Sequence, residues 1–399
     1  MLFQERSDQD ASRSIQRPRP CGPPMDRPWR DTQNLGQVSD TPQFLCEGAE
    51  WIRERDGSGH LNSIGPTVLK INPNLVLPSR LFICVIRGRI FPCLSLPSSM
   101  FICGLVFLGG LMTSPIGIIG GSGLYAMAGV KDQIQIEIDT PFGKPSDSLV
   151  TGSLEGAPVA FLSRHGVGHR LTPSEVNYRA NIWALKSVGC EILMAVSAVG
   201  SLQERHAPGC LRLPDQFIDR THLRPSTFFG DGLVAHVGFA DPTSAWLRGK
   251  LMEAGRALDL PLENGGTYVC MEGPAFSTRA ESRLHQSWGA DFIGMTQVTE
   301  AKLAREAELA FATIALVTDY DAWRDIPEAA DAHDIMAVMA ANVAKAEALL
   351  RRVVGDLKNG PPEAEPARGA LRTALMTPPE WVPAETKERL KLFIGKYGY

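Results

Sequence analysis

Short runs of apolar residues recur along the chain from residue 116 onward, and helical stretches separate them. The runs are rich in β-branched residues and apolar on both faces, which is typical of strands in a sheet that is covered on both sides. Strands that alternate with helices predict the α/β class. The expected strands are 116–119, 159–162, 192–196, 292–294 and 313–317. The expected helices are 177–188, 243–258, 277–288, 300–308 and 332–357, with a short one at 385–399.

The first quarter of the chain differs from the rest. Residues 1–59 are rich in Arg, Asp, Gln, Ser and Pro without an apolar period, which predicts disorder. The apolar stretch 76–112 is interrupted by prolines, and its most apolar piece is shorter than the ~20 residues that span a membrane. We expect 1–111 to be a disordered extension or sequence upstream of the natural start, with a membrane anchor or an organellar presequence as alternatives. One main domain is expected at 112–358, followed by a linker and short helix at 359–399.

Composition restricts the possible partners. With 44% hydrophobic and 21% charged residues, the 399-residue chain resembles a soluble globular protein, and we expect a cytoplasmic location. Its net charge of −4 argues against nucleic acid or an acidic membrane as a partner. None of the eight cysteines forms a CxxC pair, so we expect free, mostly buried thiols and no metal site.

The first expected strand runs into the glycine-rich sequence IGIIGGSG. Small residues let backbone N–H groups approach an anion closely, and Ser122 adds a hydroxyl. The same glycines fit a loose dinucleotide-binding fingerprint, with Asp139 as its acidic partner. That fingerprint requires a full helix after the glycines, whereas only residues 124–132 precede the next strand-like segment. The sequence therefore favours an anion site over a nicotinamide site.

Two further expected strands run into residues that suit an anion. Arg164 and His165 follow strand 159–162, where the arginine offers a fork of donors and the histidine a ring nitrogen. Ser197 and Ala198 follow strand 192–196 and offer a hydroxyl and open backbone N–H groups. A surface arginine and an ordinary turn are the alternatives. Residues beyond the carboxyl ends of such strands are where α/β sheets place ligands.

The last two expected strands end in residues that suit a nucleoside. Met295 and Thr296 combine a thioether with a hydroxyl, as needed to hold a sugar, although a core methionine beside a capping threonine is the alternative. Asp319 and Asp321 present two carboxylates that can accept from an exocyclic amine or give a proton to a ring nitrogen. An acidic helix N-cap is the alternative there.

Together these motifs resemble the methylthioadenosine phosphorylase branch of the purine nucleoside phosphorylase family. The resemblance covers residues 116 to about 357. It implies an α/β sandwich with a distorted, mixed central β-sheet flanked by helices, assembled as a homotrimer with each active site near a subunit interface. The most specific stretches are IGIIGGSGLY, DTPFGKPSDSL, NYRANIWALKSVGC, DQFIDRT, EGPAFSTRAES, WGADFIGMT and TDYDAWR.

The resemblance also implies roles for individual residues. The phosphate ligands that it implies are Ser122, Arg164, His165, Ser197, Ala198 through its backbone, and Thr296. The residues that it places around the sugar and base are Met295, Phe276, Ser277, Asp319 and Asp321. The residues that it places around the 5′-substituent are Ala332, Ile335, Met336 and, from the neighbouring subunit, His236. Thr299 departs from the family, which usually has proline there, and we expect a looser turn after the ribose site.

The implied reaction is phosphorolysis of 5′-methylthioadenosine to adenine and 5-methylthioribose-1-phosphate, a step of purine and methionine salvage. Phosphate beneath C1′ stabilises positive charge on the sugar. Asp319 stabilises or delivers a proton at N7, which requires a raised pKa. The carboxylate of Asp321 favours a 6-amino purine, which can donate a hydrogen bond to it. A 6-oxo group would instead place its oxygen, another acceptor, against the carboxylate. Inorganic phosphate is a co-substrate, and the reaction requires neither a metal nor an organic cofactor.

Two other functions remain open from the sequence. One is a phosphorylase for another purine nucleoside, such as adenosine, inosine or methylthioinosine. The other is a catalytically silent purine- or dinucleotide-binding module. The combination of Arg164, Thr296 and Asp319 argues against the silent module.

Overall fold

The computed structural model divides into two compact units, 1–95 and 96–399, each of which is considered by itself. In the first unit, strands β1 (Phe82–Ile86) and β2 (Arg89–Cys93) pair antiparallel. The expectations for the remainder of 1–111 lie outside the described residues. The structure describes residues 82–86, 89–93, 114–121, 129–324 and 332–399, and only the backbone of 82–93 and 332–336.

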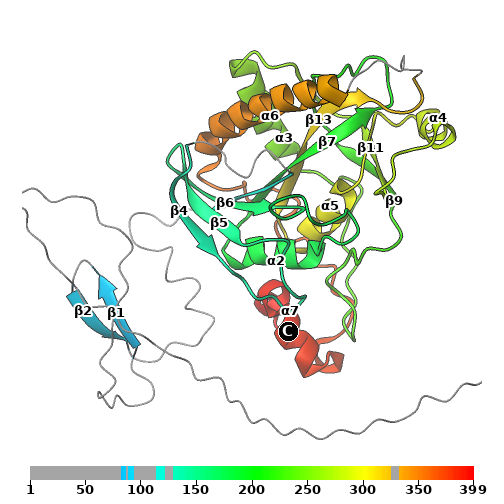
Figure 1. The fold of residues 1–399 in the computed structure, drawn as a ribbon. Coiled ribbons are helices and arrows are strands. Elements are labelled where there is room, and N and C mark those ends of the chain that lie inside the picture. Colours follow the sequence, from blue (N-terminus) through cyan, green and yellow to red (C-terminus); the bar gives the residue numbers. More distant parts are fainter. Residues whose placement is uncertain (1–81, 87–88, 94–113, 122–128, 325–331) are drawn as a thin grey trace, which may run out of the picture. The chain divides into compact units, whose positions relative to one another are not determined.

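A mixed sheet forms the centre of the second unit (Figure 1) and confirms the expected fold class; eleven of its strands lie in the described residues. Its backbone order is β10-β8-β13-β7-β3-β6-β5-β4, and β12, β11 and β9 branch from β7. The neighbours β13, β7, β3 and β6 are parallel, so their carboxyl ends lie at one edge. The strands are β3 (Ile116–Gly120), β4 (Lys131–Ile136), β5 (Leu149–Leu154), β6 (Ala157–Ser163), β7 (Ile192–Ser201), β8 (Leu211–Leu213), β9 (Gln216–Arg220), β10 (Leu262–Asn264), β11 (Thr267–Met271), β12 (Phe292–Gly294) and β13 (Ala310–Tyr320).

Helices cover both faces of this sheet, as Figure 1 shows. One apolar core lies between the sheet and α2, α5 and α7, and a second lies between the sheet and α3 and α6. Because both faces are covered, the central strands are apolar at nearly every position. The helices are α2 (Tyr178–Ser187), α3 (Ala245–Ala257), α4 (Arg279–Ser287), α5 (Gln297–Glu306), α6 (Ala332–Val354) and α7 (Ala384–Ile394).

Strand β7 shows how the two cores are separated. Ile192 and Met194 point into the core beneath α3 and α6, whereas Leu193 and Ala195 point into the core beneath α2 and α5. Successive side chains of a strand point to opposite faces, so a run without polar interruption fills both cores at once. The expectation from the apolar pattern is confirmed for this strand.

The stretch after residue 358 was expected to be a linker followed by a short helix; the helix is present as α7, and both parts of the stretch pack into the first core. Leu371 and Leu390 are fully buried there, together with Phe393. The buried carboxylate of Glu308 accepts hydrogen bonds from the Leu371 N–H at 3.0 Å and from the Tyr397 hydroxyl at 2.5 Å. Composition alone suggested a linker, because the apolar residues of this stretch are spaced without a regular period.

Several elements are longer than expected, among them β7, β13 and α5. Strand β7 continues to Ser201 because β12 pairs with its last residues, and β13 continues to Tyr320 through a register shift between Val317 and Asp319. Helix α5 begins at Gln297, three residues earlier than expected. Thr299 therefore lies in the first turn of this helix, and the looser turn stays a prediction. None of the described helices is both long and apolar enough to cross a bilayer.

Candidate active site

The candidate site is built around an opening beside β7. On one edge, β7 pairs with β3 through Ile192–Ala195 and with β12 through Gly200 and Ser201. In the described residues, the intervening segment 196–199 has no strand partner on that edge. The Val196 carbonyl accepts a hydrogen bond there from Arg164 Nη1 at 2.9 Å. Backbone groups of alternate strand residues point to the same edge, so the Ala198 N–H faces the same opening.

Arg164 follows β6 directly and is almost fully buried, with 2% of its surface exposed. Its backbone N–H donates to the Gly120 carbonyl at 2.9 Å, which fixes it beside the end of β3. Its Nε and Nη2 donate to the two carboxylate oxygens of Glu300 at 2.5 and 2.9 Å. The expected use of the whole guanidinium fork for an anion is therefore corrected: Glu300 takes the fork. One N–H on each terminal nitrogen is left over from these three bonds.

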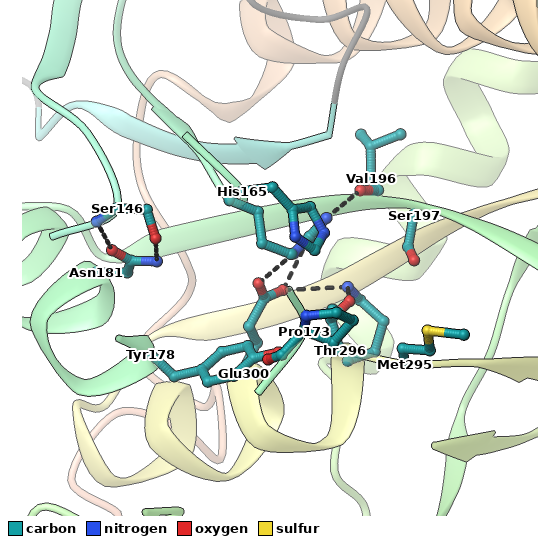
Figure 2. A network of polar contacts seen from close by, with 12 residues as sticks. Ser146, His165, Pro173, Tyr178, Asn181, Val196, Ser197, Met295, Thr296 and Glu300 are labelled. Atoms are coloured by element: carbon teal, nitrogen blue, oxygen red, sulfur yellow. Dashed lines mark hydrogen bonds and ion pairs between the residues drawn. The ribbon is translucent and has the colours of Figure 1, made fainter. Parts of the chain in front are cut away.

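Glu300 lies at the centre of a buried polar network (Figure 2) that sequence reasoning did not identify. Besides Arg164, its carboxylate accepts a hydrogen bond from Gln297 Nε2 at 3.1 Å. The same nitrogen donates to Thr296 Oγ1 at 3.0 Å. On the other side of the amide, Gln297 Oε1 accepts from the Thr313 hydroxyl at 2.8 Å. The first turn of α5 thereby links Arg164 to Thr296 within the described residues.

His165 adjoins this network and is also buried. Its Nδ1 lies 2.9 Å from the Leu171 carbonyl, which can only accept, so Nδ1 carries the proton. Burial and the positive charge of Arg164 lower the pKa of His165 to about 4. The ring is therefore neutral near pH 7 and Nε2 is an acceptor. The proton on Nδ1 serves Leu171, and the contact of this ring with an anion stays a prediction.

The two aspartates lie near the carboxyl end of β7. Asp319 is opposite Gly200 of β7, and its Oδ1 accepts from the Thr318 hydroxyl at 2.6 Å. Burial, assisted by the charge of Asp321, raises the pKa of Asp319, as the sequence-based mechanism requires. A Cβ at Gly200 would lie 3.4 Å from Asp321 Cβ and 3.7 Å from Asp319 Oδ2. The glycine therefore lets both carboxylates pack closely around β7.

Asp321 has a carboxylate oxygen that is suited to a ligand. The residue is 7% exposed, and its N–H donates to the Ser201 carbonyl at 2.9 Å. Its Oδ2 is buried and accepts no hydrogen bond from the described residues. A buried carboxylate oxygen without a donor is costly, and a donor on a bound molecule would satisfy it.

A second Arg–Glu pair, with a buried arginine and a partly exposed glutamate, supports Met295, and sequence reasoning missed it as well. Arg224 Nε donates to Glu272 Oε1 at 3.2 Å, and Nη1 donates to the Met295 carbonyl. Gly294, the residue before Met295, packs against Tyr268 so closely that a Cβ at this position would overlap the tyrosine hydroxyl. These contacts fix the backbone that carries Met295 and Thr296.

The other expected site residues are less closely gathered in the single chain. Phe276 is 84% exposed, and the Ser277 hydroxyl lies 3.8 Å from the sulfur of Met271. His236 is exposed, and its backbone N–H donates to the Ala374 carbonyl at 2.8 Å. Helix α6 begins at Ala332, as expected. The remaining expectations, which concern Ser122 and the side chains of Ala332, Ile335 and Met336, lie outside the described residues.

Three cysteines lie among the residues whose side chains the structure describes. Cys190, Cys210 and Cys270 are free, and Cys190 and Cys270 are buried. In the described ranges no three His, Cys, Asp or Glu side chains gather in a way that could hold a metal ion. Burial raises the pKa of the Cys190 and Cys270 thiols to about 12, so both stay protonated near pH 7.

Known proteins match this chain in sequence and in fold. The family model described as the phosphorylase superfamily matches residues 115–355. The S-methyl-5′-thioadenosine phosphorylases of Thermosynechococcus vestitus and Koribacter versatilis are each 53% identical to this chain. Each match covers 72% of this chain; it covers 100% of the first relative and 97% of the second. The crystal structure of a methylthioadenosine phosphorylase from an antarctic soil metagenomic library is 48% identical, with a TM-score of 0.68 over 70% of this chain and 99% of that one. The Schistosoma mansoni methylthioadenosine phosphorylase in complex with tubercidin is 35% identical, with a TM-score of 0.62 over 66% of this chain and 99% of that one. The chain therefore belongs to the phosphorylase superfamily, in its methylthioadenosine phosphorylase branch.

Proposed function

We propose that this protein cleaves 5′-methylthioadenosine with inorganic phosphate, forming adenine and 5-methylthioribose-1-phosphate. The observation that carries the proposal is the arrangement along β7. Donors suited to an anion gather near Val196, and a buried pair of carboxylates gathers near Gly200. Four residues of strand separate these positions by about 13 Å at ~3.3 Å per residue. A nucleoside with phosphate beneath its sugar can bridge that span.

At the anion end, phosphate accepts from the hydroxyls of Ser197 and Thr296 and from the Ala198 N–H. The remaining N–H groups of Arg164 add positive charge, and Ser122 supplies a further hydroxyl. Phosphate near pH 7 still carries a proton, and Nε2 of the neutral His165 ring can accept a hydrogen bond from that P–OH group. The bound phosphate then presents an oxygen to C1′ and stabilises the positive charge that develops on the sugar.

At the base end, Asp319 and Asp321 receive the purine. As the phosphate oxygen bonds to C1′, the C1′–N9 bond breaks and its electron pair moves into the purine ring. Asp319, whose pKa burial raises, gives a proton to N7, so adenine leaves as a neutral molecule. The unpartnered Oδ2 of Asp321 accepts from the 6-amino group. Phosphate supplies the nucleophile and Asp319 the acid, so the chemistry calls for no metal or organic cofactor.

The sugar and its 5′-substituent complete the proposed site. Met295 packs against the ribose, and Phe276 and Ser277 border the base and sugar. The methylthio group lies against the apolar start of α6, at Ala332, Ile335 and Met336. We further propose a cytoplasmic homotrimer. The exposed His236 of one subunit would then complete the 5′-pocket of its neighbour and bury part of Phe276.

The test is a phosphate-dependent release of adenine by the full chain. Methylthioadenosine, adenosine, inosine and methylthioinosine are compared, each with and without phosphate. We expect methylthioadenosine to be the best substrate and Asp319→Ala to abolish turnover without changing the oligomer. Cleavage that does not depend on phosphate, or normal turnover by Asp319→Ala, would overturn the mechanism. Binding of purines without any release of base would instead establish the silent binding module.

A further inference from the structure

Thr296 is the N-cap residue of α5, yet its side chain does not cap the helix. A threonine at this position ordinarily accepts a hydrogen bond from a backbone N–H of the first turn, and losing that bond costs stability. Here the hydroxyl oxygen instead accepts from the Gln297 side chain at 3.0 Å. The hydroxyl hydrogen finds no acceptor in the described part of the chain. The hydroxyl hydrogen of Thr296 is therefore available for a hydrogen bond to a ligand.

The amide of Gln297 can adopt only one orientation. The residue is completely buried, and it faces Glu300 on one side and Thr313 on the other. The carboxylate of Glu300 is paired with Arg164 and can only accept, so the amide nitrogen must face it. The amide oxygen then faces Thr313, whose hydroxyl donates to it. The second N–H of the amide is left for Thr296, as the structure shows.

We infer that Gln297 is a positioning residue that turns the Thr296 hydroxyl into an obligatory donor toward the bound oxyanion. This inference rests on the proposed function, since it concerns the phosphate end of the same site. Gln297 does not touch phosphate. It acts by occupying the oxygen of Thr296 and by adding a third donor to the carboxylate that orients Arg164.

The substitution Gln297→Glu tests this role, because it replaces two hydrogen-bond donors with acceptors. The introduced carboxylate, when ionised, could only accept, so the Thr296 hydroxyl would donate to it and would be lost to phosphate. Losing one hydrogen bond to a charged group corresponds to roughly 10- to 100-fold weaker binding. When the introduced carboxyl is protonated at lower pH, it regains one of the two donors and no longer carries a negative charge near phosphate, so part of the binding should return. Gln297→Met removes the amide without adding charge, and we expect a smaller loss of roughly threefold to tenfold.

The experiment measures inorganic phosphate binding by titration calorimetry on the full chain, together with the KM for phosphate and for the nucleoside. Gln286→Glu is the matched control, because Gln286 is a partly buried glutamine outside the candidate site, whose Nε2 donates to the Leu202 carbonyl at 2.8 Å. We expect Gln297→Glu to weaken phosphate binding roughly 10- to 100-fold near pH 8 and less near pH 6, with an unchanged nucleoside KM. The control should bind phosphate as the wild type does.

The possible outcomes separate the two proposals. Unchanged phosphate binding in both folded Gln297 variants overturns the role of Gln297, and so does an equal loss in Gln286→Glu. If Gln297→Glu does not fold, Gln297→Met decides by the same criterion. Wild-type protein that binds phosphate but releases no adenine contradicts the proposed function alone. Wild-type protein that binds no phosphate overturns both.

Discussion

Glu306 makes the stability of this protein depend on pH in a direction that is unusual for a carboxyl group. It is the last residue of α5, is 6% exposed and accepts hydrogen bonds from the Thr227 hydroxyl and the Phe228 N–H, both at 2.7 Å. These bonds favour the ionised form, but burial outweighs them and raises the pKa to about 7 from an ordinary 4.5. The folded protein therefore holds this proton more tightly than the unfolded chain does.

The sign and size of the effect follow from that difference. A pKa that is raised on folding contributes stability that is complete below pH 4.5 and is lost as the pH rises through about 7. At about 1.36 kcal/mol for each pH unit, the interval corresponds to about 3 kcal/mol. Glu306→Gln cannot ionise, so the variant should lack this loss.

The assay is urea unfolding of wild type and Glu306→Gln from pH 5 to pH 8 at one protein concentration. The free energy of unfolding of the wild type, minus that of the variant, should fall by about 3 kcal/mol across this range, because all other titrating groups cancel in the difference. Glu253→Gln, at a carboxylate whose side chain is 58% exposed, is the control for removing a surface carboxyl group. A flat difference for Glu306→Gln would show that this carboxyl is ionised throughout and would refute the reasoning.

Three further substitutions test the site and its support. Gly294→Ala forces a methyl group against the Tyr268 hydroxyl and should lower the free energy of unfolding by ~1–3 kcal/mol, seen as a lower Tm; an unchanged Tm would mean that the tyrosine moves aside freely. Glu300→Gln leaves the buried guanidinium of Arg164 without its counter-charge and should lower the free energy of unfolding in urea by ~3–5 kcal/mol. A decrease under ~1 kcal/mol would contradict an ion pair that is shielded from water. Asp321→Asn should reduce the preference for 6-amino over 6-oxo nucleosides about tenfold or more in kcat/KM, and an unaltered preference would remove this residue from base recognition.

Much of the fold could be predicted because its strands and helices carry strong local patterns. The apolar run in β7 and the 3.6-residue pattern of α2 each specify an element without help from distant residues. The ends of elements were less predictable. The extension of β7 to Ser201 depends on its pairing with β12, about 90 residues later in the chain. No local pattern carries that information.

The candidate site was predictable where a motif placed chemistry at the end of a strand, as for Arg164 and Asp319. Its supporting residues were not, because their partners are remote. Glu300 lies 136 residues from Arg164 in sequence, and a glutamate on a helix is ordinarily a solvated residue. The sequence of α5, QVTEAKLARE, holds several charged residues and does not distinguish Glu300 from the others.

The participation of α7 in the first core has a consequence for biosynthesis. Leu390, Phe393 and Ile394 seal that core against Phe228, yet they are translated well over a hundred residues after it. Domains begin to fold as they leave the ribosome, so the sheet can assemble while this apolar surface is still uncovered. A nascent chain of this protein thus carries an open patch until its last helix emerges. Messages that end prematurely within α7 should yield chains that chaperones and proteases retain, even though every proposed catalytic residue is already present.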